Sequence, residues 1–149
     1  MHPNTYKIRL LFIHKDLNFT DVRTQLSSIS GIHFGRSMNA GEDQCLISGE
    51  KGEGKYYDSR LGFDFETAEA WSKSEEKDSR DAVDEILEKL RPHKNLLSEL
   101  VGKDCSLSII VSVGVESTTS VNVDPELAGK LCDFKINLSY DLYPPDRLG

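Results

Sequence analysis

Histidine and cysteine are the side chains of this sequence that could act as catalytic bases, nucleophiles or metal ligands. His14, His33 and His93 lie far apart, and none has a partner at a recognisable catalytic or metal-binding spacing. The three cysteines are widely spaced and form no Cys-x-x-Cys pair, so they encode neither a zinc site nor a disulfide framework. We therefore expect no catalytic residue, no metal site and no cofactor.

A glycine-rich segment, Gly49-Glu-Lys-Gly-Glu-Gly-Lys55, comes close to the phosphate-binding pattern G-x-x-x-x-G-K-[ST]. Its chemistry does not fit, because Tyr56 replaces the Ser or Thr that would hold magnesium, and Glu50 and Glu53 would face phosphate oxygens. The next residues alternate in hydropathy as a strand does, whereas the motif requires a helix N-terminus. We interpret the segment as a turn between two strands.

Carboxylates are concentrated in one part of the chain, which has a net charge of −7. Residues 64–88 contain ten acidic and three basic side chains, and the rest of the chain is balanced. The negative charge disfavours binding to nucleic acid, and no calcium-loop pattern is present. Such an acidic run could steer a basic protein partner. The predicted partner-binding residues are Glu69, Trp71, Glu75, Glu76, Asp78, Asp81, Asp84 and Glu85.

These residues also have ordinary structural interpretations. Acidic side chains near the start of a helix are favoured by the helix dipole and are otherwise simply solvated. Trp71, the only tryptophan, either anchors its segment in the core or is exposed as an anchor for a partner. The sequence leaves both alternatives open.

Hydropathy patterns predict a single domain over residues 1–149. Apolar residues occupy alternate positions in 6–14, 107–115 and 136–142, as in half-buried strands, and shorter strand patterns flank the glycine-rich segment. Helical spacing is found in 19–29, 79–101 and 125–131.

Proline and glycine positions refine this pattern. Pro92 predicts a break in the long helix, and Asp124 before Pro125 predicts a capped helix start. Residues 31–44 contain several glycines and little periodicity, which is typical of a loop or an irregular edge. The predicted order β-α-β-β-α-β-α-β, with half-polar strands, indicates an α+β fold in which a largely antiparallel sheet has helices packed on one face.

A second candidate interaction surface is the face of the sheet that would point away from the helices. Its centre would be apolar and its surround polar, a composition common at protein interfaces. The alternative is that residues 31–44 pack over it. The predicted members are Lys7, Arg9, Leu11, Ile13, Ser108, Ile110, Ser112, Asn137, Ser139, Asp141 and Tyr143.

Composition indicates a globular protein, with 38% hydrophobic and 29% charged residues. The apolar stretch Leu10–Ile13 is too short for a signal-peptide core or a membrane span. We therefore expect a cytoplasmic protein with reduced thiols and no membrane partner.

The order of these features resembles the bacterial family known as domain of unknown function 4279. The resemblance is carried by residues 6–14, the helix start Asn18-Phe19-Thr20-Asp21-Val22, Trp71, residues 78–100 with their Leu-Arg-Pro, and residues 136–143. It implies the fold and a bacterial origin, and it assigns no catalytic residue. Gly31-Ile-His-Phe34 and Arg36-Ser37 depart from the pattern that such proteins often have after the first helix.

Three hypotheses of function are compatible with the sequence. The first is a non-catalytic protein-interaction domain, specifically an acidic immunity- or antitoxin-type protein that binds and neutralises a basic toxin domain. The second is a small-ligand binder or enzyme whose site is assembled from scattered residues such as His14, His33 and 49–55. The third is a homodimer formed across the open sheet face or an edge strand.

Overall fold

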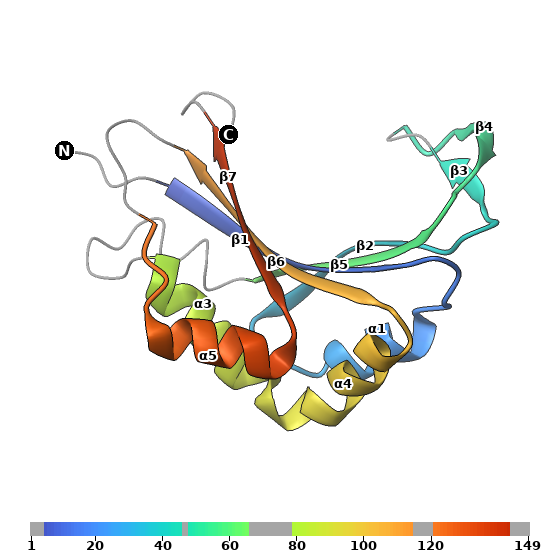
Figure 1. The fold of residues 1–149 in the computed structure, drawn as a ribbon. Helices are drawn as coiled ribbons and strands as arrows, with labels where there is room; N and C mark the ends of the chain where they lie inside the picture. Colours follow the sequence, from blue (N-terminus) through green and yellow to red (C-terminus); the bar gives the residue numbers. More distant parts are fainter. Residues whose placement is uncertain (1–4, 46–47, 66–78, 115–120, 144–149) are drawn as a thin grey trace.

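One layer of the fold is a five-stranded sheet, and the other layer consists of helices (Figure 1). The computed structural model describes residues 5–45, 48–65, 79–114 and 121–143. The strands of the main sheet are β1 (Thr5–His14), β2 (Ile32–Met38), β5 (Ser59–Phe65), β6 (Ser106–Gly114) and β7 (Asn137–Tyr143). They are ordered β2-β5-β1-β6-β7, and all neighbours are antiparallel except β6 and β7. The predicted α+β class and largely antiparallel sheet are confirmed.

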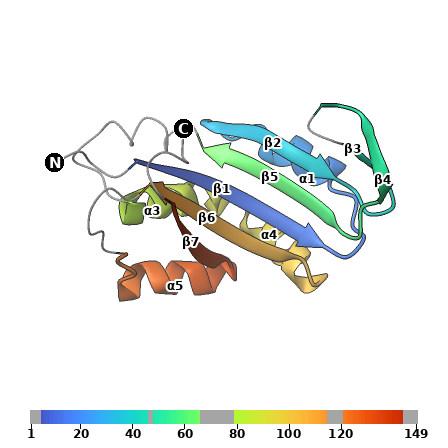
Figure 2. The same ribbon diagram turned by 90° about the horizontal axis from the view of Figure 1, so that it is seen from above.

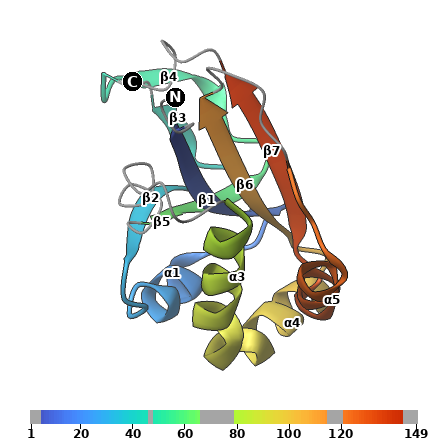
Figure 3. The same ribbon diagram turned by 90° about the vertical axis from the view of Figure 1, so that its left-hand side faces the viewer.

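The helices lie on one face of the sheet, as predicted (Figure 3). Their bounds are α1 (Thr20–Leu26), α3 (Ser79–Leu90), α4 (Lys94–Gly102) and α5 (Pro125–Phe134). A 3-10 turn around Pro92 separates α3 from α4, which confirms the predicted break. The Asp124 carboxylate accepts a hydrogen bond from the Leu127 N–H at 2.9 Å, which confirms the predicted cap of α5. None of the helices in the described ranges combines the length and apolar character needed to cross a membrane.

The core lies between the helices and the inner face of the sheet. Successive side chains of a strand point to opposite faces, so the alternating pattern of β1 buries every second residue. Phe12 is fully buried, and its ring centroid lies 6.1 Å from that of Phe19 and 6.4 Å from that of Phe63. Burial of these rings holds β1, β5 and the start of α1 together.

Of the two alternatives predicted for residues 31–44, a loop or an irregular edge, the irregular edge is found over most of the range. Residues 32–38 form β2, an edge strand paired with β5, with an irregularity between Phe34 and Arg36. The register shift at this bulge removes the simple alternation from the sequence. Because β2 lies within the sheet, it does not cover the outer face (Figure 2).

The predicted turn over residues 49–55 is also shorter than expected. Lys51–Lys55 forms β4, which pairs with β3 (Asp43–Cys45) in a separate two-stranded ribbon. The ribbon projects from the end of the sheet beyond β2 and β5 (Figure 1). β5 follows β4 and no helix does, so the arrangement differs from a phosphate-binding loop.

Candidate functional site

The candidate site is the open face of the sheet, the face that points away from the helices (Figure 2). Strand register determines which side chains share this face, because residues directly opposite each other point to the same side. Lys7 lies opposite Ser112, which lies opposite Asp141, and Arg9 lies opposite Ile110. The strand residues predicted for this surface therefore lie together.

Residues on β5 and β2 extend the open face beyond the predicted set. Arg9 lies opposite Asp64, which in turn lies opposite His33. Gly62, two residues before Asp64 in β5, is on the same face and lies between Leu11 and Arg36. The sequence did not identify these residues because strand order and register are not readable from hydropathy alone.

The centre of the open face is apolar. Leu11, Ile13 and Ile110 are each half-buried, although no described helix or strand covers them. Tyr143, at the end of β7, is 39% exposed. Serine, asparagine and charged residues surround this centre, as in many protein interfaces.

A hollow of about 390 Å³ lies on the open face over β5, β1, β6 and β7. Its apolar lining comes from Ile8, Phe65 and Ile110. Its polar lining comes from Lys7, Arg9, Asp64, Ser112, Asp141 and Tyr143.

The charges in this hollow are balanced but only partly paired. The Arg9 Nε donates to Asp64 Oδ1 at 2.9 Å, with both side chains about half exposed. Neither Lys7 nor Asp141 forms an ion pair with another residue in the described part of the chain. The hollow thus presents one cation and one anion that its own lining does not neutralise.

Across the open face, basic side chains outnumber acidic ones among the described residues. The basic residues are Lys7, Arg9, Arg36 and Arg60, and the acidic residues are Asp64, Asp141 and Asp58, which accepts two hydrogen bonds from Arg60. Because the whole chain has a net charge of −7, its excess negative charge is located elsewhere. A partner on the open face therefore meets a surface that is basic for this protein.

Two described carboxylates of the acidic run, Asp84 and Glu88, join α3 to α5. Lys130 Nζ lies 2.7 Å from Asp84 Oδ1 and 3.1 Å from Glu88 Oε1. Hydrogen bonds from Arg91, the larger contribution, and from Lys130 lower the pKa of Glu88 to about 2. A basic partner would have to compete with these internal contacts for the same carboxylates.

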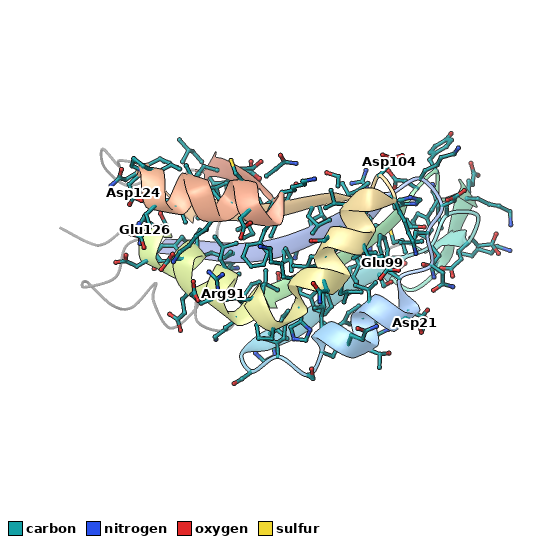
Figure 4. The ribbon with its side chains drawn as sticks, turned by 60° about the horizontal axis from the view of Figure 1, so that its bottom comes forward. Asp21, Arg91, Glu99, Asp104, Asp124 and Glu126 are labelled. Atoms are coloured by element: carbon teal, nitrogen blue, oxygen red, sulfur yellow. The ribbon has the colours of Figure 1, made fainter. Side chains whose placement is uncertain are left out.

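A second set of ion pairs joins the first turns of α3 and α5. Arg80 makes two hydrogen bonds to Asp124, at 2.7 and 3.1 Å, and lies 3.5 Å from Asp81 Oδ1. Hydrogen bonds from Arg80, the larger contribution, and from the Leu127 N–H lower the pKa of Asp124 to about 2. Figure 4 shows Asp124 and Glu126 together at the start of α5.

The structure places only some of the predicted partner-binding residues. Asp81 and Asp84 take part in the ion pairs just described, and the half-buried Glu85 also has an interaction partner. The other predicted residues lie outside the described part of the chain: Glu69, Trp71, Glu75, Glu76 and Asp78.

His14 has a structural role at the end of β1. Its Nε2 is 2.7 Å from the carbonyl oxygen of Lys103, and its Nδ1 accepts hydrogen bonds from the N–H groups of Asp16 and Leu17. Both ring nitrogens are therefore engaged. His33 lies on the open face level with Arg9, whereas His14 belongs to the alternate set of β1 residues. The structure does not bring the two histidines into one site.

The thiols described by the structure differ in exposure. Cys105 is buried and Cys132 is exposed, and both are free. Burial raises the pKa of the Cys105 thiol to about 11, so its nucleophilic thiolate form is rare near neutral pH. Within the described ranges, no three His, Cys, Asp or Glu side chains are grouped as ligands for a metal ion.

Comparison with known protein families matches residues 49–145 to the family described as Domain of unknown function (DUF4279). The chain belongs to this family. The DUF4279 match begins just before β4 and ends just after β7, and it includes three strands of the main sheet, β5, β6 and β7. It confirms the resemblance inferred from the sequence. No curated protein and no solved structure matches the chain.

Proposed function

We propose that the chain is a non-catalytic protein-interaction domain whose protein partner docks on the open face of the sheet. The observation that carries this proposal is the half-buried apolar centre formed by Leu11, Ile13 and Ile110, which no described element covers. Removing such a centre from water favours association, while its polar surround keeps the free protein soluble.

The chemistry of the described side chains supports binding rather than catalysis. Both nitrogens of His14 are engaged in hydrogen bonds, and the buried Cys105 holds its proton at neutral pH. The open face offers hydroxyl, amide, ammonium, guanidinium and carboxylate groups around an apolar centre. This is the composition of a recognition surface.

A finer proposal is that the chain is an acidic immunity- or antitoxin-type protein that neutralises a basic toxin domain. It is supported by the net charge of −7 and by the ten acidic residues in 64–88. Because Asp81 and Asp84 already contact Arg80 and Lys130, the contact with a basic partner is assigned to the carboxylates within 66–78.

Affinity capture with matched variants tests the docking surface. Leu11→Glu places a charge in the apolar centre, and Leu96→Glu makes the same change at a half-buried leucine of α4 on the helical side. Tagged wild-type chain and both variants are incubated with extract of the native host, after thermal unfolding has shown that both variants are folded. We expect a specific protein with wild type and Leu96→Glu and its loss with Leu11→Glu. Equal capture by all three would overturn the proposal.

Two further measurements distinguish a second copy of this chain from a basic toxin as the partner. Light scattering of the purified chain tests whether the occupant is a second copy, and a monomer at high concentration excludes the homodimer. Replacing Glu75 and Glu76 by glutamine tests the basic toxin. We expect slower association and a weaker salt dependence, because fewer charges then steer the encounter. An unchanged association rate would exclude the immunity-type interaction through these residues.

A further inference from the structure

We propose that the hollow on the open face binds a small zwitterionic ligand of the α-amino acid class. The ligand carboxylate contacts Lys7 and Arg9, and its ammonium group contacts Asp141. This inference goes beyond protein docking, because it assigns a small-molecule site to one part of the open face.

The balance of charge in the hollow favours a ligand that carries both signs. Asp64 accepts a hydrogen bond from the Nε of Arg9 at 2.9 Å, which holds the guanidinium group in place and neutralises it. Lys7 and Asp141 form no ion pair with other described residues. A dianion would bring a second negative charge towards Asp64 or Asp141, and a dication would meet Lys7 or Arg9. A zwitterion satisfies the two unpaired charges together.

The spacing of the strands fits a single amino acid. Lys7, Ser112 and Asp141 are directly opposite one another on three neighbouring strands. Adjacent strands lie about 4.8 Å apart, so the backbones of Lys7 and Asp141 are separated by about 10 Å, and side chains that stand roughly perpendicular to the sheet keep their charged ends about as far apart. Two charge-assisted hydrogen bonds of about 2.8 Å each leave roughly 4 Å between the ligand's charged groups. This separation suits one amino acid, and the Ser112 hydroxyl between the two charges can hydrogen-bond either group.

The remaining lining suits an apolar ligand side chain. Ile110 forms part of the floor and is half-buried, and Tyr143 contributes an exposed aromatic ring from the end of β7. A volume of about 390 Å³ lies near the lower end of the range for small-ligand pockets. We therefore assign the hollow to amino acids with an apolar or aromatic side chain.

Calorimetric titration of the purified chain tests this assignment with a set of related probes. L-Phenylalanine and L-leucine carry both charges, 3-phenylpropanoate lacks the ammonium group, and phenethylamine lacks the carboxylate. We expect saturable binding of at least one amino acid and binding at least about tenfold weaker for each singly charged probe. No binding of either amino acid at millimolar concentration, or equal binding of a singly charged probe, would overturn the proposal.

Variants then test the residues themselves. We expect Lys7→Gln and Asp141→Asn each to weaken amino acid binding about tenfold or more. Lys103→Gln and Asp104→Asn make the same changes at exposed positions between α4 and β6, and they should have no effect. If Lys7→Gln or Asp141→Asn binds as wild type does, the assignment is overturned. The two proposals can fail independently. Protein capture by Leu11→Glu tests only the docking proposal, whereas amino acid binding by Lys7→Gln and Asp141→Asn tests only the small-molecule site.

Discussion

Replacing Phe12 by alanine should destabilise the fold far more than replacing its neighbour Leu11. Phe12 is fully buried, and its ring packs against those of Phe19 and Phe63. An aromatic side chain buries about 150–250 Å², and at about 25 cal/mol per Å² its burial stabilises the fold by about 4–6 kcal/mol. Since alanine retains the Cβ atom, we expect Phe12→Ala to lower the free energy of unfolding by about 4 kcal/mol.

Leu11 is adjacent to Phe12 but points to the open face, where it is half-buried. We expect Leu11→Ala to lower the free energy of unfolding by only about 1 kcal/mol, because no described helix or strand packs over this side chain and its truncation leaves no enclosed cavity. Urea unfolding measures both values, and the dependence on urea concentration should be unchanged if the transition stays two-state. Equal destabilisation by the two variants would show that the outer face is packed like the core, and would refute the open docking face.

Three further predictions concern side chains outside the open face. His14→Ala should lower the midpoint of urea unfolding, because three hydrogen bonds at the end of β1 are lost. Cys132 should react with a maleimide much faster than Cys105 at neutral pH, as peptide mass spectrometry can measure, since burial raises the pKa of Cys105 to about 11. Asp124 and Glu88 have folded pKa values of about 2, below their unfolded values of about 4, so the stability they contribute is present above about pH 4 and is lost towards pH 2. An Asp124→Asn variant should therefore lose less stability than wild type over this pH range, as thermal unfolding can show.

The elements that could be predicted from the sequence are those with a clear local signal. The alternation in β1 and β6 reflects burial of one face, and Asp124 before Pro125 is a local cap signal that needs no tertiary contact. β2 was missed because its bulge interrupts the alternation. β4 was missed because Lys51–Lys55 contains little besides glycine and charged residues, and its strand form depends on pairing with β3.

Only part of the candidate site could be predicted from the sequence. The members on β1, β6 and β7 follow from alternation within each strand, whereas Asp64 and Arg36 join them only through the order and register of β5 and β2. The pairing of Asp84 with Lys130 joins residues on two helices and depends on how α3 packs against α5. No local pattern contains that information, so the sequence could not show that these carboxylates are engaged within the chain.

Hydroxyl-radical footprinting of the purified chain, alone and with the protein captured by it, tests the docking surface most directly. The method reports how exposed individual side chains are to solvent. We predict that oxidation of Leu11, Ile13 and Ile110 decreases in the complex, while that of Leu96 on the helical side is unchanged. Protection confined to the helical side, with unaltered oxidation of Leu11 and Ile110, would contradict it.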